Sequence, residues 1–399
     1  MVNKKDRVYK DKASCSGCSA CYSICPTKAI TMHTDERGFS FPEIDEEKCI
    51  SCNLCEKVCP WKKEYPWKKD MENSDDAQSM LRCYAAKHMD KEMIASSRSG
   101  GAFTALSDVV LDSGGCVYGA AMDADFVTRH HRAVSKLERD AFKKSKYVQS
   151  EIGNSYEKVK VDLEDGKQVL FSGTACQCSG LKAYLSKAGV NMDKLILLDL
   201  VCAGVPSPKV FADYLNWLQK KSKKKIERFE FRDKDKYAWG EGVEKVRYSN
   251  GKVRYQDYFT GSLFFEAWVR RECCFHCPWA RVERETDITL GDFWGVDKIC
   301  RELYDDKGCN LVLVHTPKGE ALFQSAKKDL LVKEVSREQV AHSQKHLYQP
   351  TEKPKDYDAF WEDYGKLPFS KVMKKYASNT VSDSFFKKVI RKGLRFMTR

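Results

Sequence analysis

The sequence predicts an α+β chain in which a small cysteine-rich module precedes a larger mixed α/β domain. Eight of the 18 cysteines lie within residues 15–59 and repeat one spacing. Farther along, short apolar runs alternate with glycine turns and helix-like segments, the pattern of α/β folds. The predicted parts are the module, a linker, the N-terminal and C-terminal parts of the second domain, and a charged, basic tail: residues 1–65, 66–80, 81–165, 166–345 and 346–399.

Both halves of the first module read C-x2-C-x2-C-x3-C-P, the run of bacterial two-cluster ferredoxins, in which the fourth cysteine of each run ligates the other cluster. Short strands are expected at residues 29–32 and 39–44. We assign one 4Fe-4S cluster to Cys15, Cys18, Cys21 and Cys59, and a second to Cys49, Cys52, Cys55 and Cys25. CxxC pairs also form zinc sites, but three successive cysteines followed by Cys-Pro favour the clusters.

The composition indicates an ordinary globular protein of a reducing compartment. Hydrophobic residues make up 42% and charged residues 32% of the 399 residues, which argues against extensive disorder. The first ten residues contain no apolar stretch typical of a secretory signal, so we expect a cytoplasmic protein without a transmembrane segment. The net charge of +12 is accompanied by no nucleic-acid-binding motif, and no nucleic-acid partner is predicted.

The second domain is predicted from alternating strands and helices. The expected strands are residues 83–87, 116–121, 169–172, 195–200 and 311–315, and the expected helices are residues 102–111, 179–188, 210–219 and 319–329. An Asn-Gly turn should join residues 243–248 and 252–255 in a hairpin. Two strands deliver Cys176 and Cys202 just past their carboxyl ends, the edge where open α/β sheets bind ligands.

A third cysteine group could therefore form in this domain. Its members are Cys176, Cys202, Cys274 and Cys277. A CxxC pair and two single cysteines suffice for a further 4Fe-4S cluster. Buried free thiols are the alternative, and Cys273 competes with Cys274 as a ligand.

Six segments resemble the coenzyme F-420 hydrogenase/dehydrogenase beta-subunit family over roughly residues 80–345: SRSGGAFTAL, SKYVQS, VLFSGTACQCSGLKAYL, LVCAGVPSPKVF, CCFHCPWA and DITLGDFWG. The resemblance implies an iron-sulfur flavoprotein whose third cluster uses the group just named. It also implies that FAD phosphates contact Ser99, Gly100, Gly101 and Thr104, and that Lys146, Tyr147, Gln149 and Ser150 line the flavin. Relatives usually have Pro and His where this chain has Ala175 and Ala203.

The expected activity is that of an FAD- and 4Fe-4S-dependent oxidoreductase, because a flavin exchanges hydride with a two-electron carrier and passes single electrons to clusters. Its partner would be a redox protein or a soluble hydride carrier such as coenzyme F-420. A non-catalytic relay subunit is the alternative. His131 is a weak candidate for proton delivery, and a structural histidine is the safer assumption.

The last stretch, residues 385–399, contains six basic residues among apolar ones. Such a helix could lie on an anionic membrane surface. An exposed terminal helix is the alternative. Neither a G-x-G-x-x-G nor a GK[ST] loop occurs, which disfavours a Rossmann nicotinamide site and nucleotide hydrolysis.

Overall fold

The computed structural model describes residues 8–9, 11–62, 81–341 and 344–381. It divides into two compact units, Met1–Pro208 with Arg271–Glu352, and Lys209–Arg270 with Lys353–Arg399. The basic stretch at 385–399 lies outside the described residues. Within them, no helix has the length and apolar character needed to cross a bilayer.

The cysteine-rich module has the two strands that the sequence predicts. Its elements are α1 (Ala20–Ile24), β1 (Ile30–Thr34), β2 (Ser40–Ile44) and α2 (Leu54–Lys57). The strands pair antiparallel, with Ile30 opposite Ile44. Ser19 and Asn53, which precede the two helices, both have left-handed backbones, with φ of 66° and 59°. The repeated cysteine spacing is thus accompanied by a repeated turn.

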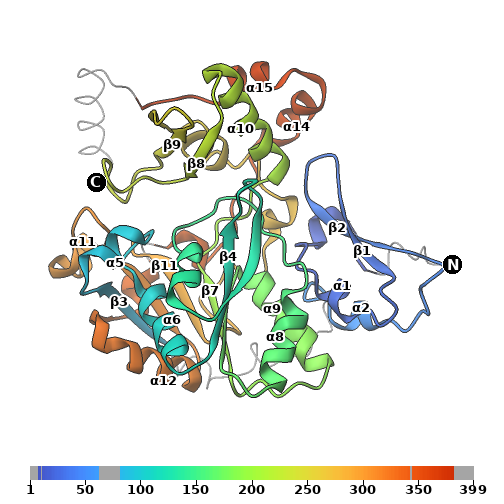
Figure 1. Ribbon diagram of the computed structural model, residues 1–399, viewed down its shortest axis with the longest axis vertical. Coiled ribbons are helices and arrows are strands. Elements are labelled where there is room, and N and C mark those ends of the chain that lie inside the picture. Colours follow the sequence, from blue (N-terminus) through green and yellow to red (C-terminus); the bar gives the residue numbers. More distant parts are fainter. Residues whose placement is uncertain (1–7, 10, 63–80, 342–343, 382–399) are drawn as a thin grey trace. The chain divides into compact units, whose positions relative to one another are not determined.

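An eight-stranded sheet forms the centre of the first unit, so the predicted mixed α/β fold class is confirmed (Figure 1). The strand order is β13-β3-β12-β11-β7-β6-β4-β5. β4, β6, β7 and β11 are parallel, whereas the pairs toward both edges are antiparallel. The strands are β3 (Arg82–His88), β4 (Cys116–Met122), β5 (Thr128–Ala133), β6 (Val169–Ser172), β7 (Leu195–Leu200), β11 (Ile288–Asp292), β12 (Asn310–Val314) and β13 (Leu330–Val335).

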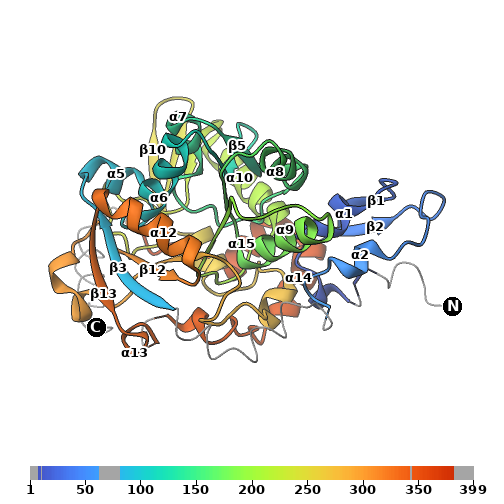
Figure 2. The ribbon, with the colours of Figure 1, turned by 90° about the horizontal axis from the view of Figure 1, so that it is seen from below.

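Helices cover both faces of this sheet because its central strands are apolar on both sides. Leu170 and Ile196 pack with α6 (Ala102–Asp112) and α12 (Pro317–Ala326). Their chain neighbours pack on the other face with α8 (Ser155–Glu164) and α9 (Ala175–Lys187), which also contacts α1 (Figures 1 and 2). The other α-helices described in this unit are α5 (Lys91–Ser96), α7 (Lys136–Arg139), α11 (Val296–Ile299) and α13 (Arg337–Ala341).

Helix α9 begins four residues before the predicted start at residue 179. Thr174 caps it, and the side chains of Thr174 and Gln177 form a reciprocal capping box. Cys176 consequently lies in the first helical turn rather than in the preceding loop. β5, where charged residues obscure a strand, was not predicted, and neither were α8 and β13.

The second unit contains a three-stranded antiparallel sheet, β10-β9-β8. Its predicted Asn-Gly hairpin is present, with Val253 opposite Arg247. Two helices occupy part of the predicted charged tail, and their aromatic residues pack within this unit: Phe360 stacks on Trp268 at 6.4 Å. The elements are α10 (Pro208–Ser222), β8 (Ile226–Glu230), β9 (Glu244–Tyr248), β10 (Val253–Gln256), α14 (Tyr357–Lys366) and α15 (Phe369–Tyr376).

A polar network on central strands of the large sheet should make the stability of the first unit sensitive to acid. The Thr289 hydroxyl lies 2.9 Å from His315 Nε2 and donates to Asp199. Burial, with a smaller effect of Arg284, lowers the pKa of His315 from 6.5 to about 3. The unfolded chain therefore binds a proton as the pH falls through 6.5 while the folded chain does not, and stability decreases below that pH.

We expect this histidine to reduce the free energy of unfolding by about 2 kcal/mol near pH 5 relative to neutral pH. Denaturant titrations of the wild-type chain and of His315→Gln, which keeps a donor for Thr289, measure the effect. The variant should show a shallower loss of stability on acidification. Equal slopes in the two proteins would contradict this assignment.

Candidate iron-sulfur sites

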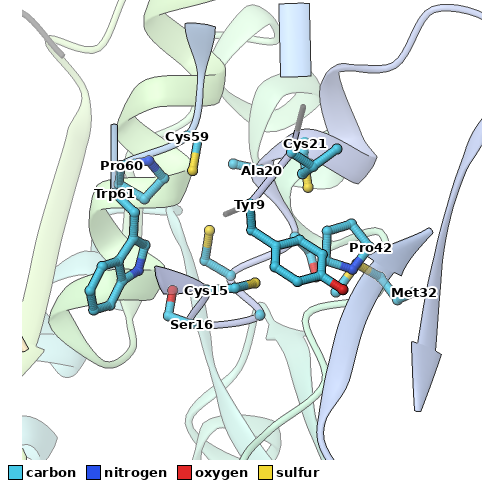
Figure 3. Close-up of a pocket in the computed structure, with 14 residues that line it drawn as sticks. Tyr9, Cys15, Ser16, Ala20, Cys21, Met32, Pro42, Cys59, Pro60 and Trp61 are labelled. Carbon is cyan, nitrogen blue, oxygen red and sulfur yellow. The ribbon is translucent and has the colours of Figure 1, made fainter. Parts of the chain in front are cut away.

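The first predicted quartet, Cys15, Cys18, Cys21 and Cys59, lines one pocket of the N-terminal module. Figure 3 shows Cys15, Cys21 and Cys59 on different sides of this pocket. Burial raises the pKa of Cys18 and of Cys21 far above that of a free thiol, and neighbouring thiols of the quartet add to the effect. Such thiols ionise only when a bound cation compensates the charge, so this pocket fits an iron cluster.

The second predicted quartet, Cys25, Cys49, Cys52 and Cys55, lines a separate pocket. The Ala29 amide donates to Cys25 Sγ at 3.3 Å, the kind of hydrogen bond that tunes cluster sulfurs. Burial raises the pKa of Cys55 to about 11. Cys52 and the neighbouring Ile50, 63% of whose surface is accessible, are exposed. This second pocket therefore reaches the surface of the first unit.

The fourth cysteine of each run lies in the pocket of the other run, as expected for a two-cluster ferredoxin. Cys59, from the second run, lines the pocket of the first run, and Cys25 lines that of the second. Among the residues that the structure describes, no group of three or more His, Cys, Asp or Glu side chains is arranged to hold a single metal ion. The two quartets surround pockets whose donor set, four thiols each, suits a 4Fe-4S cube.

The third group lies at the carboxyl edge of the parallel strands. Cys176 follows β6 and Cys202 follows β7, which pair directly. Burial raises the pKa of Cys202 to about 12, with further contributions from Cys274 and Cys176. Burial also raises the pKa of Cys277, and Cys176, Cys274 and Cys202 add to it. The four thiols are thus mutual electrostatic neighbours, as a shared cluster would require.

Polar groups around these thiols could stabilise thiolates. The Thr174 hydroxyl lies 3.1 Å from Cys176 Sγ, and the Gly204 amide donates to Cys202 Sγ at 3.3 Å. The amide of Cys274 is bound to the Arg271 carbonyl at 3.0 Å. Cys273 is 2% exposed, and its thiol neighbours those of Cys274 and Cys176. The Cys274 thiol contributes to the raised pKa of both Cys202 and Cys277, for each of which burial is the largest cause. This arrangement favours Cys274 over Cys273 as the ligand.

The N-terminal module packs directly on the helix that carries Cys176. A Cβ atom at Gly180 of α9 would lie 2.9 Å from Cys18 Sγ and 3.1 Å from the Tyr156 hydroxyl oxygen. Burial raises the pKa of Cys18, and Cys176 is one of the thiols that contribute. A glycine at this position therefore lets the first quartet approach the third.

The glycine-rich turn before α6 lies at the same sheet edge, but protein groups occupy much of it. Ser99 Oγ donates to the Cys309 carbonyl at 2.7 Å, and the Ala102 amide donates to Asn310 Oδ1 at 3.0 Å. A Cβ at Gly100 would meet the Ala86 carbonyl at 2.6 Å. Gly101, with φ of 88°, is the N-cap. These contacts give the turn a packing role in the described part of the chain.

Thr104 is buried one turn into α6, and its hydroxyl has no partner among the described residues. Of the two polar side chains predicted at the phosphate site, Ser99 has a hydrogen-bond partner, and Thr104 has none within the described part of the chain. A buried hydroxyl without a partner is costly. Thr104 is therefore the prediction that best fits contact with a bound group.

The other predicted flavin residues also have protein partners. Lys146 Nζ donates to the carbonyls of Ala141 and Lys143, both at 2.8 Å. The Ser150 hydroxyl accepts from Gln177 at 3.0 Å, and Tyr147 is engaged by other residues as well. Gln149 Nε2 donates to the Ser16 carbonyl of the cysteine module at 3.1 Å. The structure thus places Gln149 at the junction of module and sheet.

His131, the candidate for proton delivery, has a 44% exposed side chain, and its Nε2 lies 2.8 Å from Asp123. Its neighbour His130 points inward, stacks on Phe171 at 5.2 Å, and lies 3.2 Å from the Ser172 carbonyl at the end of β6. Alternation along β5 separates the two rings. The structure thus gives His131 a surface hydrogen bond with Asp123.

The fold and the quartets define an iron-sulfur redox protein. Residues 14–63 match the family described as the 4Fe-4S dicluster domain. Residues 166–339 match the family described as the C terminus of the beta subunit of coenzyme F420 hydrogenase/dehydrogenase. These two matches lie over the cysteine-rich module and over the C-terminal part of the second domain, where the motifs predict them.

One similar solved structure is the xenon-derivatized F420-reducing NiFe hydrogenase complex from Methanosarcina barkeri. A chain of that complex is 18% identical, with a TM-score of 0.45, and the match covers 64% of the present chain and 82% of the other. No curated protein matches the sequence significantly.

Three contacts of this region were not anticipated from the sequence: those of Gly180, Arg271 and the pair Trp61–Trp279. A repeated Cys-Pro-Trp segment, at residues 59–61 and 277–279, was the available signal for the tryptophans. No sequence signal indicated the contact of Arg271, because its side chain donates to the Cys15 carbonyl, 256 positions away.

Proposed function

We propose that the chain is an iron-sulfur flavoprotein oxidoreductase that transfers electrons between a two-electron carrier or organic substrate at FAD and one-electron 4Fe-4S clusters. The observation that carries this proposal is the gathering of three cysteine quartets in one unit, with Cys18 and Cys176 as electrostatic neighbours. Clusters take single electrons, so a series of neighbouring sites forms a one-electron path.

The residues proposed to hold iron are the three quartets: Cys15, Cys18, Cys21 and Cys59; Cys25, Cys49, Cys52 and Cys55; and Cys176, Cys202, Cys274 and Cys277. The thiols supply the ligands, and nearby amides, such as that of Gly204, donate to the sulfur atoms. Cys18 and Cys21 are buried, whereas Cys15, Cys59 and the four thiols of the third quartet are partly exposed.

FAD is proposed from the family to which residues 166–339 belong. A bound flavin would supply the exchange between hydride and single-electron chemistry. Of the residues predicted to contact it, only Thr104 offers a buried hydroxyl without a partner in the described part of the chain, whereas Ser99, Lys146 and Ser150 already have partners. The turn before α6 and residues 146–150 would have to change partners to contact it, so we derive no reaction step through these residues.

Cofactor content is the decisive first measurement. Protein purified without oxygen should contain about twelve irons, about twelve acid-labile sulfides and one FAD per chain. Oxidation of a hydride carrier, with coenzyme F-420 tested first, should then reduce the clusters. About eight irons and no flavin, also after reconstitution, would contradict the proposal.

A relay subunit without its own substrate site is the second candidate. The protein partners of Ser99, Lys146 and Ser150 favour it, because those groups are already satisfied. The relay predicts full iron loading, no flavin, no turnover of soluble hydride carriers, and a stable complex with a partner enzyme. Turnover by the isolated chain would exclude it.

The second quartet is the proposed contact point for a redox partner protein. Its loop exposes Ile50 and Cys52, whereas the first quartet packs against α9. Ile50→Glu should therefore weaken reduction by an external protein donor about tenfold or more while the iron content stays unchanged. Dithionite, a small reductant that needs no docking, provides the control: its reaction should be unaffected.

A further inference from the structure

A single arginine joins the loop of the third quartet to the loop of the first. Arg271 is 1% exposed. Its Nε donates to the Cys15 carbonyl at 2.8 Å and its Nη2 to the Ser40 carbonyl at 3.0 Å. Its own carbonyl accepts from the Cys274 amide at 3.0 Å, and its amide donates to Val205. The residue thus belongs to one cysteine loop and holds the other.

The rest of the guanidinium is also occupied. Nη1 donates to Gln149 Oε1 at 3.1 Å, and the Phe41 ring lies 4.1 Å from the guanidinium carbon. A Cβ at Gly17, beside Cys18, would come within 3.1 Å of Nη1. All of these groups lie in the first unit. These contacts therefore fix the orientation of the planar guanidinium.

These partners are neutral carbonyls, an amide oxygen and an aromatic face. A buried cation is costly unless negative charge lies nearby. The guanidinium binds the backbone of Cys15, while Cys273 and Cys274 follow Arg271 within three residues, and the Asp35 carboxylate also lies near it. Iron clusters bound by the first and third quartets would add net negative charge near the guanidinium.

A second contact joins the same two sites. Trp61 lies two residues after Cys59, and Trp279 lies two residues after Cys277. Their rings meet edge to face, with centroids 5.4 Å apart and an interplanar angle of 79°. Trp61 also lines the pocket of the first quartet (Figure 3). The two Cys-Pro-Trp segments therefore approach each other from opposite sites.

We propose that Arg271 is a positioning residue that holds the first and third cluster sites together and raises the reduction potentials of both, so that electrons pass between these two sites. This inference rests on the proposed function, because it requires iron at the third quartet. In each transfer one electron leaves one cluster and enters the other, and no bond forms or breaks. The positive charge favours the reduced, more negative form of either cluster.

The test uses the full chain, purified without oxygen, and redox titration followed by electron paramagnetic resonance. In Arg271→Gln the two flanking clusters should become harder to reduce: the oxidised-to-reduced ratio at a fixed solution potential should rise at least tenfold, equivalent to 59 mV for one electron. The cluster at Cys25, Cys49, Cys52 and Cys55 should not shift. Arg271→Lys, which keeps the charge but lacks the planar guanidinium, should change the ratio less than threefold.

Gln149→Glu provides a second variant in case Arg271→Gln does not load iron. It keeps the acceptor for Nη1 and adds a negative charge beside the guanidinium, so both flanking clusters should again become harder to reduce. Arg37→Gln is the matched control, because Arg37 is a 25% exposed cation of the same module that pairs with Glu272 at 3.8 Å. Solvent screens that charge, and little shift is expected.

Unchanged ratios in both Arg271→Gln and Gln149→Glu would overturn the proposal. Equal shifts in Arg271→Gln and Arg271→Lys would also overturn it, since geometry rather than charge would then set the potentials. The proposed function fails differently: a wild-type chain with about eight irons would lack the third site, whatever the variants do.

Discussion

Cys274→Ala should reduce the iron content of the anaerobically purified chain from about twelve to about eight atoms, because one of the three proposed clusters would lose a ligand. The signals of the two N-terminal clusters should remain. Cys274 is the neighbour whose thiol, with those of Cys176 and Cys202, raises the pKa of Cys277. Iron and sulfide analysis with electron paramagnetic resonance measures this loss.

The adjacent cysteine provides the matched control. Cys273→Ala removes a thiol of the same size from the same loop, and Cys273 is buried. It should leave about twelve irons in place. If Cys273→Ala loses four irons and Cys274→Ala does not, the ligand assignment is reversed. If neither variant loses iron, the third quartet is not a cluster site.

Gly180→Ala should destabilise the first unit by about 1–3 kcal/mol, the usual result of overpacking a fitted contact. The new methyl group would lie 2.9 Å from Cys18 Sγ, 3.0 Å from Cys18 Cβ and 3.1 Å from the Tyr156 hydroxyl oxygen. Tyr156 cannot move freely, because its hydroxyl donates to the Gln177 carbonyl at 2.6 Å. Iron bound by Cys18 would hold the sulfur as well.

Denaturant unfolding and the rate of iron release in air measure this effect. Gly365→Ala is the control, since Gly365 also lies inside a helix, α14, and no described atom stands within 4 Å of the position that its new methyl group would take. There alanine should stabilise the helix by up to about 1 kcal/mol. A Gly180→Ala chain as stable as the wild type, with unchanged iron release, would show that α9 and the cysteine-rich module are not tightly packed at this position.

Local sequence patterns were sufficient to predict much of the fold. Residues 169–172 and 195–200 form β6 and β7 as predicted, because continuous apolar runs bounded by turns suit strands buried on both faces. The Asn-Gly hairpin follows from turn chemistry in the same way. β5 was missed because Arg129, His131 and Arg132 lie in it, and only pairing with β4 makes them a strand.

For the sites, the sequence by itself determined which cysteines belong to each N-terminal quartet, since the repeated spacing and its prolines are local. It also indicated that Cys176 and Cys202 share a sheet edge. Tertiary structure alone decided that the first quartet lies against α9, through Gly180, and that Arg271 reaches Cys15. These contacts join residues more than 150 positions apart, and no local pattern records which helix face or which carbonyl a distant side chain will meet.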